Sequence, residues 1–313
     1  MKIALLFEHP TWSDDLVQTF DRNAVPVEPI SLADLSFSPD RDTKDFDLVV
    51  NRVNIMPSKD RDPSVVFHTL HYLSVLEARG IRVINGSRAH FAGASKALQN
   101  ALISNLGLDC PAAVAVYRSG QVMAAAERIG FPLIVKPNIG GSGSGIARYD
   151  SREELALALA AGPVDFGVDG TGLVQSYIRS DGYVYRVEIL GDRLFYSIRQ
   201  KMQAGTYNYC AADGCAVSGP ETRNGETQFD FCALNTESRI QPFDADPAVV
   251  DQVIRIIRAA GADLGGVEYL LDQKTGRPCF YDFNPYSNFV SDGEQLLGFS
   301  PEQRFVDYIR SFE

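Results

Sequence analysis

A run of glycine and serine lies between two strand-like segments, and no other feature restricts the possible folds as much. The stretch reads FPLIVKPNIGGSGSGIARYD over residues 131–150. Glycine-rich loops that bind phosphate usually lead from a strand directly into a helix. Here the next helix begins only after Ser151, which forms a capping-box pattern with Glu154. The segment therefore predicts a β-hairpin with the glycine-rich loop at its tip.

This loop matches neither common nucleotide-binding motif. A G-x-G-x-x-G motif would need glycine where Ile146 stands, and a P-loop would need lysine there. Glycines let the backbone bend and let its amides approach an anion, so a phosphate-binding loop and a flexible surface turn are both open. Lys136 ends the strand before the loop and favours phosphate, although a solvated lysine is the alternative. The loop residues expected at phosphate are Gly141, Ser142, Gly143, Ser144 and Gly145.

Composition excludes several classes of function. The chain has 313 residues, 45% of them apolar, which is enough for about two domains. Its net charge of −11 argues against nucleic acid as a partner, and no apolar run reaches the roughly 20 residues that cross a membrane. With no signal-peptide pattern and an odd count of five cysteines, we expect a cytoplasmic protein with reduced thiols. Cys210 and Cys215 have no second pair nearby, so no zinc site is expected.

Hydrophobic periodicity divides the chain into three parts. Residues 1–92 alternate strand-like and helical runs, which is typical of a small domain built on a parallel sheet. Residues 93–174 contain the glycine-rich hairpin with helices before and after it. Residues 175–313 start with strand-like runs, and GVEYLLD and PCFYDFN form a hairpin pattern around KTG. These runs predict a small α/β domain built on a parallel sheet, followed by mixed helical and strand segments.

Acidic residues within this last hairpin predict a metal site. Glu268 interrupts an apolar strand, while Asp282 and Asn284 are two residues apart and therefore share one strand face. Carboxylate and amide oxygens are the ligands that Mg²⁺ prefers. Two exposed strands are the alternative reading, but the flanking aromatic residues indicate burial, and buried carboxylates need partners. Nucleotide phosphates would complete the coordination of the ion.

Taken in order, these segments resemble the ATP-grasp superfamily, and most closely its RimK-type, glutamate-ligase-like carboxylate–amine ligases. The likeness covers about residues 48–290, and residues 1–92 are similar to the family's pre-ATP-grasp domain. SKALQNALISNLGLDCPAA resembles the helix with an ATP-contacting lysine, which implies that role for Lys96. FPLIVKPNIGGSGSGIA resembles the strand and loop that cover the phosphates, which implies Lys136 and the loop. The resemblance implies an α/β and α+β fold, in which a small parallel-sheet domain precedes two α+β lobes and ATP lies between the two lobes.

The hinge between these lobes is implied by LVQSYI, which resembles the segment whose backbone meets adenine. It assigns adenine contacts to Gln175, Tyr177 and Ile178, although the family usually has glutamate where Ser176 stands. Asp181 stands where a ribose-binding acid often lies.

Phosphate and metal contacts are implied by the remaining strands. YRVEIL and SIRQK resemble strands that contact phosphate or acyl phosphate, which implies this role for Arg186, Arg199 and Lys201. Arginine suits it because its planar fork pairs with two phosphate oxygens, while surface arginines are the alternative. GVEYLLD and FYDFNPYSNF resemble the family's metal motif, with Asp and Glu exchanged. The metal ligands implied are Glu268, Asp282 and Asn284.

The resemblance implies a two-step reaction that uses ATP and two Mg²⁺ ions, with Mn²⁺ as a substitute. A carboxylate attacks the γ-phosphate to give an acyl phosphate, and an amine then displaces phosphate. The substrates would be small molecules or peptides, and homodimers occur among relatives. Arg52 follows a strand of the parallel sheet at the edge where such sheets bind ligands, so it is a candidate substrate contact. Tyr207 and Asn208 are two further candidates, and all three could instead be surface residues.

Two other functions are compatible with the same motifs. An ATP-grasp kinase would phosphorylate a hydroxyl of a sugar or cyclitol and stop there. A regulatory module would bind the nucleotide without turnover, but the complete set of metal ligands argues against it. The acidic composition argues against kinases that act on polyphosphates.

Overall fold

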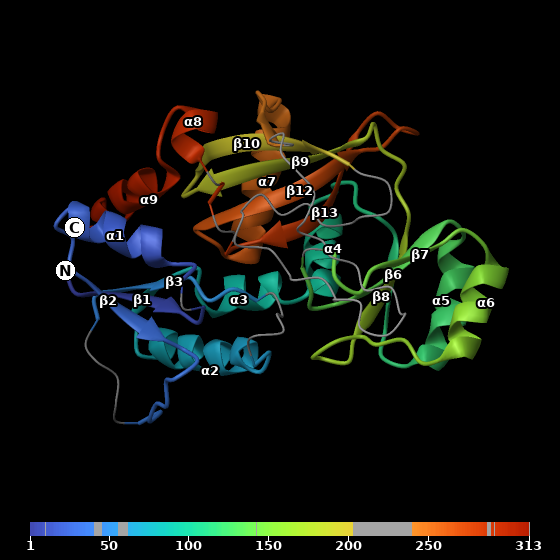
Figure 1. Cartoon of the computed structure of the whole chain (residues 1–313), viewed down its shortest axis with the longest axis horizontal. Coiled ribbons are helices and arrows are strands. Elements are labelled where there is room, and N and C mark those ends of the chain that lie inside the picture. Colours follow the sequence, from blue (N-terminus) through green and yellow to red (C-terminus); the bar gives the residue numbers. More distant parts are fainter. Residues whose placement is uncertain are drawn as a thin grey trace, which may run out of the picture.

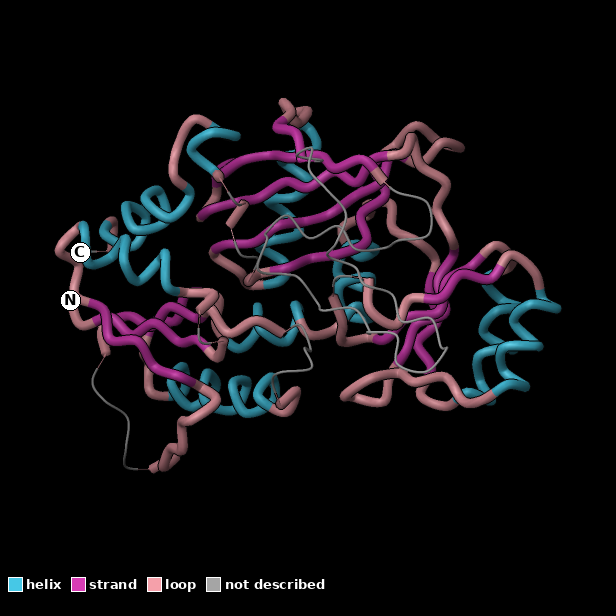
Figure 2. Tube along the Cα trace, in the orientation of Figure 1, coloured by secondary structure: helices cyan, strands magenta, loops and turns pink. Residues whose placement is uncertain are grey.

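The computed structural model of the protein describes residues 1–9, 11–40, 46–55, 62–141, 143–202, 240–286, 289–290 and 292–312. Its strands form three sheets, each covered by helices, and Figures 1 and 2 show them side by side. Both chain ends lie beside the N-terminal sheet (Figure 1). The domain boundary expected near residue 92 falls within helix α3 (Ser87–Gly93), and the one expected near residue 174 falls within strand β8 (Gly172–Ser176) of the central sheet. Both boundaries stay predictions.

Strands of the N-terminal sheet are all parallel and follow the order β2-β1-β3-β4. The predicted parallel sheet is therefore confirmed, with one strand, β2, that its charged and proline-containing sequence did not indicate. Its strands are β1 (Ile3–Phe7), β2 (Val27–Ser31), β3 (Leu48–Asn51) and β4 (Arg82–Ile84). Its helices are α1 (Asp14–Arg22), α2 (Val65–Ala78) and α3 (Ser87–Gly93).

The central sheet is antiparallel and has the order β5-β8-β6-β7. Leu133 pairs with Tyr149 across β6 and β7, so the predicted strand-flanked hairpin is confirmed. Ser151 caps the next helix by accepting from Glu154 N, as its capping-box pattern predicts. The strands are β5 (Ala113–Val116), β6 (Leu133–Pro137), β7 (Ala147–Tyr149) and β8 (Gly172–Ser176). The helices are η1 (Ser119–Gln121), α5 (Val122–Ile129) and α6 (Arg152–Ala161).

The C-terminal sheet is antiparallel in the order β11-β10-β9-β12-β13, and its β12–β13 hairpin confirms the pattern around KTG. Two helices pack against it, α4 (Lys96–Asn105) on β13 and α7 (Pro247–Ala260) on β9 and β12. Buried Val187, Val267 and Phe283 form a core with α7, so this face of the sheet is closed to solvent. The strands are β9 (Tyr183–Leu190), β10 (Arg193–Lys201), β11 (Ile240–Pro242), β12 (Leu264–Leu271) and β13 (Pro278–Asn284).

The C-terminal helices pack against the N-terminal part of the chain. Helices α8 (Gly293–Leu297) and α9 (Pro301–Arg310) follow the C-terminal sheet, and α9 packs on α1 (Figure 1). Phe305 of α9 shares one buried cluster with Phe20 of α1 and Phe195 of β10. One continuous core therefore joins the N-terminal and C-terminal sheets.

Replacing Phe305 by alanine is expected to lower the free energy of unfolding by about 3–5 kcal/mol, because the ring is fully buried and would leave a cavity. Chemical denaturation followed by circular dichroism measures the loss. Phe91→Ala is the matched control, since this ring is 52% exposed and its removal should cost far less. Equal losses in the two variants would contradict the shared core.

Candidate functional site

A row of charged side chains crosses the open face of the C-terminal sheet. The strand register places Arg186 of β9, Glu268 of β12 and Asp282 of β13 side by side. Asn284 lies two residues beyond Asp282 and so projects from the same face. The row lies on the side opposite α7, because the residues that alternate with it form the α7 core. The sheet therefore presents these groups on the face opposite its α7 layer.

Each carboxylate of this row is already paired with a hydrogen-bond donor. Arg186 Nη1 donates to Glu268 Oε1 at 3.0 Å, and Tyr281 Oη donates to Glu268 Oε2 at 2.7 Å. Lys96 Nζ, at the start of α4, forms an ion pair with Asp282 Oδ1. Burial raises the pKa of Glu268, while the neighbouring Arg186 opposes that rise. Each carboxylate therefore has a positively charged partner, Arg186 for Glu268 and Lys96 for Asp282, as a carboxylate removed from water requires.

The same row can supply oxygen ligands to a hard cation. Glu268 and Asp282 are anionic cross-strand partners, and Asn284 adds an amide oxygen that accepts from Tyr286 N at 2.9 Å. Within the described residues no three His, Cys, Asp or Glu side chains form a metal cluster. A site here therefore depends on the amide and on oxygens from a ligand, a donor set that Mg²⁺ accepts.

Lys136 of the central sheet interacts electrostatically with the charged row. The side chain is buried near the end of β6. Burial, followed by the charge of Lys96, lowers the pKa of Lys136 to about 7, against the opposing effects of Asp282 and Glu268. Two lysines from different elements thus lie within electrostatic reach of the carboxylate row. A polyanion is the ligand whose charge such a pair would stabilise.

ATP binding is expected to take up a proton at Lys136. Free Lys136 is half protonated near pH 7, whereas an adjacent phosphate favours the charged form and raises the pKa. Affinity for ATP should therefore fall as the pH rises above 7, by up to about tenfold per pH unit. Calorimetry at pH 8 in buffers of different ionisation enthalpy measures the uptake. Lys136→Arg, which stays charged, should abolish it, and uptake in that variant would contradict the assignment.

Asn138 connects the two segments that carry Lys96 and Lys136, and sequence reasoning did not single it out. Its Oδ1 accepts from Ala97 N at 2.9 Å and its Nδ2 donates to Asp169 Oδ2 at 2.7 Å. Its backbone oxygen accepts from Lys96 N at 3.3 Å. Asn138 therefore fixes the start of α4 against the end of β6. The only signal in the sequence was a turn-forming asparagine directly after Pro137.

Removing the Asn138 side chain should weaken nucleotide binding about tenfold, because a partly buried N–H and a carboxylate would lose their partners, at a cost of about 1–3 kcal/mol. Asn100→Ala is the matched control. Asn100 lies on α4, and its Nδ2 donates to Pro111 O at 2.7 Å rather than to a group beside Lys136. Both variants should lose similar stability, and only Asn138→Ala should lose affinity in calorimetric titration. Equal affinity in the two variants would sink this assignment.

The glycine-rich loop forms a tight turn that needs glycine. Ser144 N donates to Gly141 O at 3.0 Å, and Gly143 and Gly145 have φ of +73° and +71°. A side chain at Gly145 would also meet Pro137 at 2.8 Å. Gly141, Gly143, Ser144 and Gly145 thus lie together at the tip of the hairpin. Ser142, also expected at phosphate, lies outside the described residues.

Residues expected at adenine and ribose lie at the end of the central sheet. Gln175 is buried in β8 between β5 and β6. Tyr177 N donates to Pro132 O at 3.1 Å, and Ile178 beside it is half-buried. Asp181 accepts from Tyr185 Oη at 2.6 Å, so its carboxylate is engaged by β9. These positions remain predictions as nucleotide contacts.

Arg199 and Lys201 are not brought to the charged row. Arg199 lies opposite Tyr185 in the register, and Lys201 lies opposite Tyr183. Tyr185 belongs to the core on the α7 side, and the Arg199 guanidinium lies 5.0 Å from the centre of the Tyr183 ring. Strand alternation therefore places these two cations on the face opposite Arg186. Their predicted contact with phosphate is not supported by this geometry.

The expected substrate residues are placed only in part. Arg52 directly follows β3, as the sequence predicted, but its Nη1 is buried and its guanidinium lies 4.9 Å from the centre of the Phe289 ring. Burial lowers the pKa of Arg52, and Glu188 is the largest opposing charge. Tyr207 and Asn208 lie outside the described residues.

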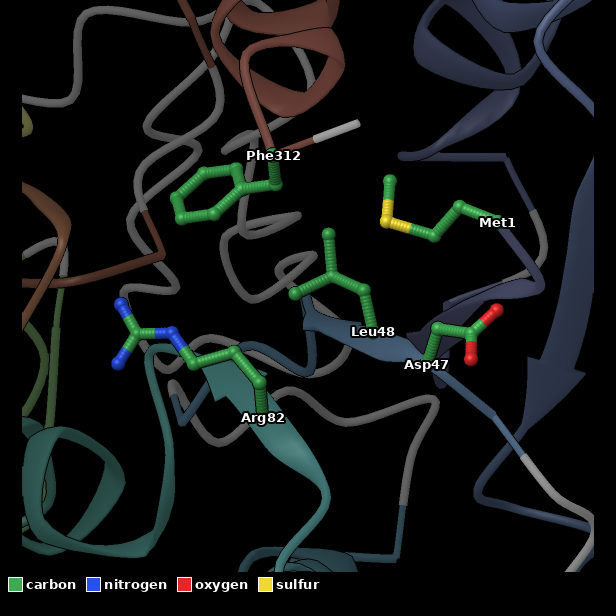
Figure 3. A pocket seen from close by; sticks show the side chains of 5 residues that line it. All are labelled: Met1, Asp47, Leu48, Arg82 and Phe312. Carbon is green, nitrogen blue, oxygen red and sulfur yellow. The ribbon is translucent and has the colours of Figure 1, made fainter.

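A surface pocket of about 440 Å³ lies elsewhere, beside the two chain ends (Figure 3). Asp47 precedes β3 and Arg82 begins β4, so this pocket is at the amino ends of the parallel strands. Arg52 and Glu8 follow their strands at the other edge of the sheet. The pocket is therefore separate from the charged row. Its lining residues are Met1, Asp47, Leu48, Arg82 and Phe312.

Comparison with known proteins finds similarity to several ATP-dependent enzymes over part of the chain. Residues 95–193 match the family described as carbamoyl-phosphate synthase L chain, ATP binding domain. D-alanine–D-alanine ligase B of Xanthomonas campestris pv. campestris is 31% identical over 210 residues, which are 65% of this chain and 58% of that protein. The carbamoyl phosphate synthase large chain of Xanthomonas axonopodis pv. citri is 26% identical over 216 residues, 67% of this chain and 18% of that protein.

A solved structure extends the match to the whole chain. The RimK domain ATP-grasp protein of Sphaerobacter thermophilus DSM 20745 superposes with a TM-score of 0.68 at 16% identity, over 98% of this chain and 99% of that one. The chain therefore has the fold of that ATP-grasp structure, and the predicted fold class is confirmed. The chain spans less than two thirds of the length of the two curated relatives.

Proposed function

We propose that this protein is an ATP-dependent carboxylate–amine ligase. The observation that carries the proposal is the row of Arg186, Glu268 and Asp282, which lies within electrostatic reach of Lys96 and Lys136. This combination suits the triphosphate of a metal-bound nucleotide. Two relatives named as a D-alanine–D-alanine ligase and a carbamoyl phosphate synthase support ligation over phosphorylation of a hydroxyl.

Each charged group has a distinct part in the proposed reaction. Lys96 and Lys136 bind the phosphates of ATP, and the glycine-rich loop covers them. Glu268, Asp282 and Asn284 hold Mg²⁺, which neutralises phosphate charge when bound; we propose two ions, with Mn²⁺ as a substitute. The substrate carboxylate attacks the γ-phosphate to form an acyl phosphate and ADP, and the amine then displaces phosphate. Because positioning and charge suffice, no protein nucleophile is needed.

The substrate class is a small-molecule or peptide carboxylate together with an amine. We propose cytoplasmic action, with a homodimer as the assembly to test, and no role for nucleic acid, because the chain carries a net charge of −11. Among the described residues, no helix has the length and apolar character to cross a membrane.

Hydroxylamine trapping tests the proposal without knowledge of the amine. The protein is incubated with ATP, Mg²⁺, hydroxylamine and pools of carboxylic acids. A ligase should release ADP and free phosphate and form a hydroxamate from one pool, which can then be divided to identify the acid. ADP release with the phosphate retained on an organic product would instead show a kinase and refute the ligase.

A further inference from the structure

The next set of cross-strand neighbours on the same sheet face contains a buried glutamate and ends at Asn284. The register places Glu188 of β9 opposite Gly266 of β12, which in turn lies opposite Asn284 of β13. Glu188 is fully buried, at 0% exposure, and Arg186 Nε donates to its Oε1 at 2.7 Å. A buried carboxylate lowers stability unless it is paired, so the position of Glu188 beside the proposed metal ligands (the metal-ligand row: Glu268, Asp282 and Asn284) needs an explanation.

Arg186 is held between two carboxylates from neighbouring strands. Its Nε contacts Glu188, and its Nη1 contacts Glu268 at 3.0 Å. Burial by itself would lower the pKa of Arg186, but Glu188 and then Glu268 outweigh it, so the guanidinium stays charged. One cation is thus shared by two anions, and only one of these anions belongs to the metal-ligand row.

Gly266 makes room for this arrangement. A Cβ atom at this position would lie 2.7 Å from Arg186 Nε and 2.6 Å from Arg186 Nη2. Arg186 Nη2 is buried, with no hydrogen-bond partner among the described residues. The guanidinium therefore lies directly against Gly266 of β12, and its contacts with Glu188 and Glu268 fix its orientation.

We propose that Glu188 is a positioning residue for the metal site: by pairing with Arg186 it leaves the negative charge of Glu268 available to a divalent cation. Without Glu188, the full charge of Arg186 would be neutralised by Glu268 alone, and a cation would meet one more uncompensated positive charge. Arg52, whose charge also interacts with that of Glu188, would add to this repulsion. The inference rests on the proposed binding of metal-bound ATP by this row.

Removal of the Glu188 charge has opposite consequences for the cation and for the nucleotide. In the variant Glu188→Gln, Mg²⁺ should bind more weakly, because one more positive charge lies a few ångströms away. An anionic nucleotide without metal should bind as well as before or more tightly, for the same reason. A merely structural defect would weaken both. The opposite signs therefore separate a positioning role from loss of packing.

The test measures binding rather than turnover. ATP affinity is determined in EDTA, and the Mg²⁺ concentration that half-saturates metal-dependent ATP binding is determined separately. Glu188→Gln should raise this half-saturating concentration about tenfold or more, with ATP affinity in EDTA unchanged or higher. Glu188→Asp keeps the charge and should stay within about threefold of the natural protein. Arg186→Met combined with Glu188→Gln removes both charges and should return the half-saturating Mg²⁺ concentration toward that of the natural protein, while ATP affinity in EDTA falls because Arg186 is lost.

An unchanged Mg²⁺ requirement in Glu188→Gln, or an equal loss of both affinities, would overturn the inference. If Glu188→Gln does not fold, Glu188→Asp and the double variant test the inference instead. A double variant that binds Mg²⁺ tenfold more weakly than the natural protein would overturn the inference. Failure of the natural protein to bind ATP with Mg²⁺ would refute the proposed nucleotide site itself, and is thereby distinguished from failure of the inference.

Discussion

Asp282→Asn is expected to lower ATP turnover about a thousandfold or more, because the row then loses one of its two anionic metal ligands. Asp282 has a second role, since it is paired with Lys96, and that lysine would lose its ionic partner. Removing a group that stabilises the phosphoryl group during its transfer raises the activation free energy by several kcal/mol in sites of this kind. The rate of ADP release at saturating Mg²⁺ and ATP is the measurement.

Asp272→Asn is the matched control for this change. Asp272 lies at the turn of the same β12–β13 hairpin and accepts from Lys274 N at 2.9 Å, away from the charged row. The chemical change is identical, so a general weakening of the hairpin would affect both variants. A loss below about tenfold in Asp282→Asn, or equal losses in the two, would contradict the metal-ligand assignment.

Lys136→Met is expected to weaken ATP binding about a hundredfold, since the variant keeps the length of the side chain and removes its charge. The phosphate that this ammonium would pair with is left in a buried site without its counter-ion, which typically costs about 2–5 kcal/mol. Calorimetric titration with ATP and Mg²⁺ at pH 6.5, where most Lys136 is protonated given its pKa of about 7, gives the largest contrast.

Lys274→Met is the control, because Lys274 is exposed in the turn between β12 and β13. It removes one positive charge from the same protein, so any long-range effect of net charge appears in both variants. Affinity of Lys136→Met within about threefold of this control would show that ATP does not meet Lys136.

Local sequence patterns were sufficient to predict the framework of the fold and part of the site. Alternation along single strands placed Asp282 and Asn284 on one face, and hairpin pairing added Glu268. The glycine-rich hairpin could likewise be predicted, because Ser151 marks where the next helix starts. These features depend on neighbours in sequence, which is why one sequence reveals them.

Features that depend on register between strands could not be predicted. Arg186 and Arg199 look equivalent in sequence, yet Ile198 is the residue opposite Arg186, which places Arg199 on the other face. A register irregularity between Leu194 and Tyr196 contributes to this offset. Glu188 was missed for the same reason, since a strand glutamate reads as exposed until its neighbours across the sheet are known.

Transfer of oxygen from substrate to phosphate tests the central claim most directly. Once trapping has identified the acid, its carboxylate is labelled with ¹⁸O and incubated with ATP, Mg²⁺ and the amine. Attack of a carboxylate oxygen on the γ-phosphate, followed by cleavage of the acyl C–O bond, leaves that oxygen on the released phosphate. The ligase predicts one ¹⁸O atom in each phosphate formed, as seen by mass spectrometry. Unlabelled phosphate, released at the same rate, would contradict an acyl phosphate and with it the proposed function.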